Sequence, residues 1–132
     1  PAVRRAIHLV REGRVVGVFP EGGRVMRSES VISGGPVKAG VCTISIRSGT
    51  PVLPVVVLGC DELSGIVPWL PVRRGRVWMA VGREVWPPAR TERRSNRSDR
   101  IEMAQRLGEE FVRSYRELVS AAGLEEREGG RA

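Results

Sequence analysis

The residues best suited to chemistry lie together in one glycine-rich turn, Phe19-Pro20-Glu21-Gly22-Gly23-Arg24. The turn directly follows an apolar run that predicts a buried strand. Loops at the carboxyl end of a strand in an open α/β sheet form the ligand crevice, and glycines let backbone N–H groups approach an anion. Arg24 could then bind a phosphate, while Glu21 could hold Arg24 or a loop N–H group in place. The alternative is a solvent-exposed turn with a flanking salt bridge.

Charge and composition narrow the possible partners of this turn. The 132 residues include 22 basic and 15 acidic side chains, a net charge of +7, and are 41% apolar, which fits one globular domain. Such a surface attracts phosphate groups, nucleic acid or an anionic membrane. Aromatic residues make up only 5% of the chain, so we expect no nucleic-acid partner. Cys42, Cys60 and the single histidine have no metal-site spacing, and both cysteines are predicted to be small buried hydrophobes.

The elements that must position the turn follow from the apolar pattern. Helical spacing predicts a helix over 2–12 that ends at Gly13, and a second helix from Pro36 to Gly49. Apolar, β-branched runs predict strands over 14–19, 52–58 and 76–81. Runs of this kind separated by helices are typical of a parallel sheet covered on both faces. We therefore expect an α/β fold with a mostly parallel open sheet flanked by helices.

The carboxyl-terminal third has a different pattern. Residues 89–98 read as a basic linker, and Asp99 with Glu102 predicts the start of a packing helix over 99–123. Its apolar stripe would comprise Ile101, Leu107 or Gly108, Phe111, Tyr115 and Leu118. The tail at 124–132 is expected to be disordered. Residues 1–88 would then form the carboxyl-terminal part of the α/β domain.

Three ordered motifs resemble the glycerophospholipid acyltransferases, the lysophosphatidic-acid acyltransferase family. In that family a strand of the type V-x-I-F-P-E-G leads into an F-P-E-G-T-R turn, a K-x-G begins the next helix, and a G-x-P-I-V-P-V strand follows. The chain has Val15 to Arg24, then Lys38-Ala39-Gly40, then Gly49-Thr50-Pro51-Val52-Leu53-Pro54-Val55. The resemblance covers about residues 2–85. It implies a glycerolipid-acyltransferase-like α/β fold that is incomplete at its amino terminus.

The resemblance also implies a reaction and a site. An acyl group would pass from acyl-CoA or acyl carrier protein to the hydroxyl of a lysophospholipid or glycerol phosphate in phospholipid biosynthesis, with no other cofactor. The acceptor phosphate would be bound by Phe19, Pro20, Glu21, Gly22, Gly23, Arg24 and Lys38. Gly23 stands where the family usually has Thr and Val25 where it often has Ser, which affects acceptor choice more than acceptor binding. Lys38 is expected to be a structural or phosphate-neighbouring charge rather than a catalytic group.

One family motif is missing from the chain. The family activates the acceptor hydroxyl with His-x4-Asp, in which the histidine is the general base. The only histidine here is His8, and Gly13 stands five residues later. His8 is expected on a helix before the strand, so we expect the catalytic pair upstream of Pro1 and an inactive fragment. The alternative is a non-catalytic protein of the same fold that binds lipid phosphate or an anionic membrane.

A second segment could bring the protein to a membrane surface. Large apolar residues stand among arginines in the loop after Cys60, namely Ile66, Val67, Trp69 and Leu70 beside Arg73, Arg74 and Arg76. Tryptophan at head-group level and arginine on anionic lipid would suit a peripheral contact on the cytoplasmic face. The alternative is a loop folded over the core. The longest apolar stretch, 52–60, is about half the length that a transmembrane helix needs.

Overall fold

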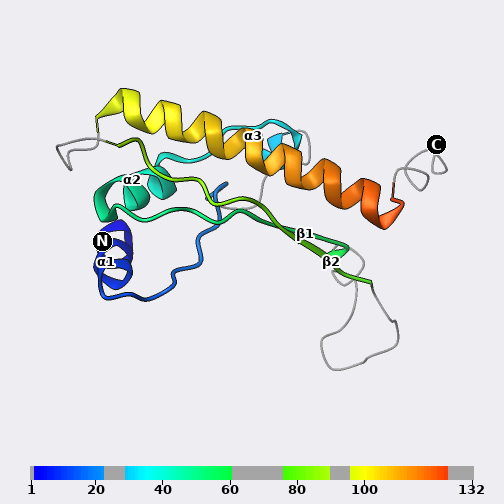
Figure 1. Cartoon of the computed structure of the whole chain (residues 1–132), viewed down its shortest axis with the longest axis horizontal. Helices are drawn as coiled ribbons and strands as arrows, with labels where there is room; N and C mark the ends of the chain where they lie inside the picture. Colours follow the sequence, from blue (N-terminus) through cyan, green and yellow to red (C-terminus); the bar gives the residue numbers. More distant parts are fainter. Residues whose placement is uncertain (1, 23–28, 61–75, 90–95, 125–132) are drawn as a thin grey trace.

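The computed structural model describes residues 2–22, 29–60, 76–89 and 96–124. In chain order its elements are α1 (Ala2–Arg11), the 3-10 turn η2 (Val31–Ser33), α2 (Ala39–Ser48), β1 (Val55–Leu58), β2 (Trp78–Val81) and α3 (Arg97–Ala122). The long helix α3 runs across α2 and the two strands, and α1 lies on the other side of α2 (Figure 1). The predicted membrane-contact loop, apart from Arg76, and the tail from 125 lie outside the described residues.

The two helices of the first fifty residues confirm the sequence prediction. α1 ends two residues before Gly13, whose φ of +79° is a left-handed conformation that glycine adopts without a steric penalty. It buries Ala6 and Ile7 and packs against α2. The guanidinium of Arg11 donates a hydrogen bond of 2.6 Å to the carbonyl of Arg47, which links the carboxyl-terminal ends of the two helices.

α3 confirms the predicted packing helix but corrects its start. The N-cap is Asn96, whose side-chain oxygen accepts from the backbone N–H of Asp99 at 2.8 Å. Asp99 itself lies inside the first turn and is buried, so the predicted pairing of Asp99 with Glu102 as a cap was wrong. The buried stripe is Met103, Leu107, Phe111, Ser114 and Leu118, whereas Ile101 is 51% exposed.

The sheet differs from the predicted one. β1 and β2 pair antiparallel, with Val55 opposite Val81 and Leu58 opposite Trp78, and an isolated bridge joins Val52 to Val85. Within the described residues this is the whole sheet, so the mostly parallel open sheet expected from the sequence is not what they form. The strands at 52–58 and 76–81 were predicted, but their direction relative to each other was not.

The predicted buried strand at 14–19 was wrong. This segment forms no strand, and most of its apolar side chains face solvent: Val15 is fully exposed and Phe19 is 87% exposed. The physical reason is that β-branched residues favour extended backbone, but a strand exists only where a neighbouring strand supplies hydrogen bonds. Neither β1 nor β2 pairs with this segment.

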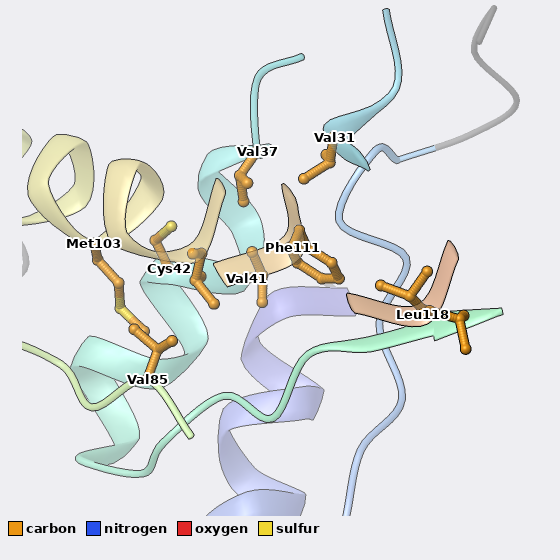
Figure 2. Packing of buried hydrophobic residues seen from close by; sticks show 10 residues of the cluster. Val31, Val37, Val41, Cys42, Val85, Met103, Phe111 and Leu118 are labelled. Carbon is orange, nitrogen blue, oxygen red and sulfur yellow. The ribbon is translucent and has the colours of Figure 1, made fainter. Parts of the chain in front are cut away.

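The core lies between α3, α2 and one face of the sheet. Met103, Phe111 and Leu118 of α3 belong to one buried cluster with Val41 and Cys42 of α2 and with Val56 and Val85 from the sheet region. Figure 2 labels these side chains, Val56 apart, within the cluster. Burial raises the pKa of the Cys42 thiol, as expected for a buried hydrophobic cysteine. Cys60 is exposed, so the prediction that both cysteines are buried was wrong for Cys60.

The other face of the sheet is uncovered among the described residues. Side chains alternate between the two faces of a strand, and the face away from α3 carries Val55 and Val57 of β1 opposite Val81 and Met79 of β2. These four side chains are between 42% and 63% exposed. We call them the exposed sheet face.

Candidate phosphate-binding site

The predicted phosphate-binding turn is described as far as Gly22. The N–H of Gly22 donates to the carbonyl of Phe19 at 3.1 Å, so residues Phe19 to Gly22 form a tight turn. Gly22, the last residue of the turn, has a φ of +72°, a conformation that favours glycine. Phe19 is exposed, and Pro20 is partly buried. Gly23 and Arg24, which the sequence placed in the same site, lie outside the described residues.

Glu21 holds the turn to the following loop. Its Oε1 accepts a hydrogen bond from the backbone N–H of Val31 at 2.9 Å and another from the Ser30 hydroxyl. One of the two roles considered for Glu21, holding a loop N–H group, is therefore the one seen. Sequence reasoning missed Ser30 and Val31 as the partners, because a separation of nine or ten residues belongs to no local motif.

Lys38 lies against the same turn. Its backbone N–H donates to the carbonyl of Pro20 at 2.9 Å, and a Cβ built on Gly22 would lie 3.4 Å from Cγ of Lys38. The Lys38 side chain is exposed, and its residue is the N-cap of α2 with extended backbone. The structure thus brings together two motifs that stand sixteen residues apart in the sequence.

The amino-terminal end of α2 adds a favourable field for anions. The first N–H groups of a helix have no partner within the helix, and the aligned peptide dipoles make this end positive. The Lys38 side chain makes no capping hydrogen bond there, and the first turn of α2 contains no acidic residue. An ammonium group and open helix amides beside the Phe19–Gly22 turn can together bind a phosphate.

His8 lies on α1, as the sequence predicted. Its Nε2 is 3.2 Å from Oε1 of Glu12, one turn later on the same helix, and 74% of its side-chain surface is exposed. Among the described residues, no side-chain hydrogen bond or ion pair joins His8 or Glu12 to the Phe19–Gly22 turn or to Lys38.

No three His, Cys, Asp or Glu side chains in the described ranges are grouped so that they could hold a metal ion. None of the helices that the structure describes is both long enough and apolar enough to cross a membrane.

Comparison with known proteins finds a similarity in the part of the chain that carries this site. Residues 1–58 match the family model described as Acyltransferase. A stretch of 61 residues is 34% identical to a chloroplastic 1-acyl-sn-glycerol-3-phosphate acyltransferase of Brassica napus, covering 46% of this chain and 17% of that relative. No solved structure matches the chain. Residues 1–58, which contain the turn, Lys38 and α2, are therefore similar to the acyltransferase family, and this match covers less than half of the chain.

Proposed function

We propose that the chain is the acceptor-binding part of an acyltransferase of phospholipid synthesis. The reaction moves an acyl group from the thioester of acyl-CoA or acyl carrier protein to the hydroxyl of a lysophospholipid or glycerol phosphate. In this proposal the acceptor phosphate is bound by the Phe19–Arg24 turn and Lys38. The family match and the name of the Brassica napus relative support the reaction class.

The observation that carries the proposal is the pair of hydrogen bonds that fasten the turn. The Pro20 carbonyl binds the N–H of Lys38, and the Glu21 carboxylate binds the N–H of Val31. The two bonds hold the turn beside an ammonium group and the positive end of α2 before any ligand arrives. A site that is already ordered loses less conformational entropy when a phosphate binds. With Oε1 committed to two donors, Glu21 serves as a clamp and not as a ligand.

Acyl transfer needs a base as well as a phosphate site. The acceptor oxygen forms a bond to the thioester carbonyl carbon, the carbon–sulfur bond breaks, and the hydroxyl proton must pass to a general base. His8 is the only histidine of the chain, and it is exposed and paired with Glu12. We therefore propose that these 132 residues bind the acceptor without turning it over. Measurable acyl transfer by this chain would contradict that part of the proposal.

Calorimetric titration with glycerol 3-phosphate tests the site directly. A charged hydrogen bond contributes about 1.5–3 kcal/mol, so Lys38→Ala and Arg24→Ala should each raise the Kd about tenfold or more. Arg47→Ala is the matched control, because it also removes one positive charge but lies exposed in the last turn of α2, at the end opposite Lys38. An unchanged Kd in both Lys38→Ala and Arg24→Ala would remove the site assignment.

A further inference from the structure

The loop that precedes α2 folds back upon one of its own carbonyl groups. The backbone N–H groups of Ser33 and Gly35 both donate to the carbonyl of Ser30, each at 2.9 Å. A carbonyl oxygen has two lone pairs, so it can accept both donors at once. The two bonds bring Gly35 back beside the residues at which the loop begins.

The close approach at Gly35 leaves no room for a side chain. A Cβ built there would lie 1.9 Å from the carbonyl oxygen of Glu29 and 2.9 Å from that of Ser30. Both oxygens belong to rigid, planar peptide groups, which cannot turn aside as the end of a long side chain can. Gly35 is not among the glycines with a positive φ, so it is space and not backbone conformation that requires glycine here.

The residues beside Gly35 hold the phosphate-binding turn. The Ser30 hydroxyl and the Val31 N–H both donate to Oε1 of Glu21. Val31 is 1% exposed and belongs to the core, and η2, which begins at Val31, lies against α3 (Figure 1). Glu21 is thus attached to the core of the protein at one end of the loop.

The other end of the loop leads to Lys38. Two residues separate Gly35 from Lys38, and one of them is a proline, whose ring fixes φ and stiffens the connection. The N–H of Lys38 donates to the carbonyl of Pro20 at 2.9 Å. We call the Glu21–Val31 and Pro20–Lys38 hydrogen bonds the fastening bonds. Gly35 stands between them in the chain.

We propose that Gly35 is a positioning residue of the phosphate site, which acts through the two fastening bonds to hold the Phe19–Gly22 turn beside Lys38. A side chain at this position widens the loop, and the wider loop cannot keep both bonds. Either the turn or Lys38 then leaves its place, so the two no longer face the same phosphate. The inference rests on the proposed function, because it takes the turn and Lys38 as the phosphate site, and it adds a residue outside that site.

Gly35→Ala tests the inference, because it adds one methyl group and changes no charge. The Kd for glycerol 3-phosphate, measured by calorimetric titration, should rise about tenfold, the effect of losing one charged hydrogen bond. Gly82→Ala is the matched control: its Cβ would lie 2.5 Å from Oγ of Ser114, so it disturbs the packing of α3 instead of the loop. The Kd of Gly82→Ala should stay at the wild-type value. Equal Kd values for the two variants would overturn the inference.

A double-mutant cycle with Glu21→Ala tests the route of the effect. Glu21→Ala removes one fastening bond, so the wider loop of Gly35→Ala can keep the other. Adding Gly35→Ala to Glu21→Ala should therefore raise the Kd less than twofold, against about tenfold in the wild type. A purely structural role would not couple the two residues in binding. A tenfold rise in both backgrounds would overturn the positioning role.

Ser30→Ala keeps the inference testable if circular dichroism shows that Gly35→Ala is unfolded. It removes the hydroxyl that donates to Glu21 and introduces no new atom into the loop. A weaker hold on Glu21 should raise the Kd for glycerol 3-phosphate about twofold or more. An unchanged Kd would overturn the inference, because the loop would then not position the turn.

The outcomes separate this inference from the function on which it rests. If the wild type binds glycerol 3-phosphate and Lys38→Ala weakens binding, but Gly35→Ala does not, the inference fails and the proposed function stands. If neither Lys38→Ala nor Arg24→Ala weakens binding, or the wild type does not bind, the phosphate site itself is refuted.

Discussion

Replacing Glu21 with alanine should lower the free energy of unfolding by about 2 kcal/mol. The backbone N–H of Val31, a residue that is 1% exposed, would lose its acceptor, and a buried unsatisfied donor costs about 1–3 kcal/mol. The Ser30 hydroxyl would lose the same acceptor, but a hydroxyl can rotate toward another partner. The Val31 amide therefore dominates the effect.

Urea denaturation measures this change. Small proteins lose about 1–3 kcal/mol of stability per molar urea, so the midpoint should fall by about 1 M. Glu21→Gln keeps a side-chain oxygen but removes the charge, and should cost about 1 kcal/mol because hydrogen bonds to charged groups are stronger. Glu29→Ala is the matched control, since Glu29 is an exposed glutamate in the same loop.

Two results would refute the reasoning about Glu21. One is a free energy of unfolding of Glu21→Ala that lies within about 0.5 kcal/mol of the wild-type value, the range of ordinary surface substitutions. The other is an equal loss of stability in Glu29→Ala, which would mean that the effect comes from the charge of the loop and not from the hydrogen bonds of Glu21. Amide exchange adds a local test, because the Val31 N–H should exchange faster in Glu21→Ala than in wild type.

Three further predictions concern Gly82, Glu110 and the two cysteines. Gly82→Ala should lower stability by about 1–3 kcal/mol in thermal unfolding, because its Cβ would lie 2.5 Å from Oγ of Ser114 and 2.9 Å from Oε1 of Glu110; an unchanged Tm would contradict this contact. The pKa of Glu110 is lowered, first by the hydrogen bond that Arg113 donates to it. Its carboxylate therefore stabilises the fold at pH values above the unfolded-state pKa of about 4.3. This stabilisation is lost as the pH falls through the lower pKa of the folded state. The stability difference between wild type and Glu110→Gln should therefore shrink from pH 7 to pH 3, and a constant difference would refute the ionic role. A thiol reagent at pH 8 should label Cys60 at once and Cys42 only after unfolding, with equal labelling rates as the contrary result.

The helices could be predicted from the sequence because they depend on interactions between residues close together in the chain. A helix is held by hydrogen bonds between residues four apart, so the apolar spacing and the glycines at 13, 49 and 123 predicted the helices and their ends to within a few residues. The N-cap of α3 was missed because Asn96 and Asp99 both carry suitable side chains, and only the backbone shows which one stands outside the helix.

Pairing between strands was beyond sequence reasoning. Val15 and Val18 are β-branched residues, which are common in strands. A strand also needs a hydrogen-bonding partner, which can come from any part of the chain, and neither β1 nor β2 pairs with this segment. In the candidate site, too, the local motifs could be predicted from the sequence and the contact between them could not. The turn and Lys38 were each identified as motifs, but the hydrogen bond from Lys38 to Pro20 that joins them is a tertiary contact.

The exposed sheet face has a consequence for the behaviour of the protein in solution. No described residue covers the valine and methionine side chains that stand side by side on this face, and a contiguous exposed apolar patch promotes association between molecules. The net charge of +7 opposes this by keeping molecules apart. Added salt shortens the reach of that repulsion to about 10 Å at 0.1 M and leaves apolar attraction in place. High-salt buffers, commonly chosen to keep basic proteins dispersed, should therefore increase the self-association of this protein. Buffers of low ionic strength should keep it monomeric.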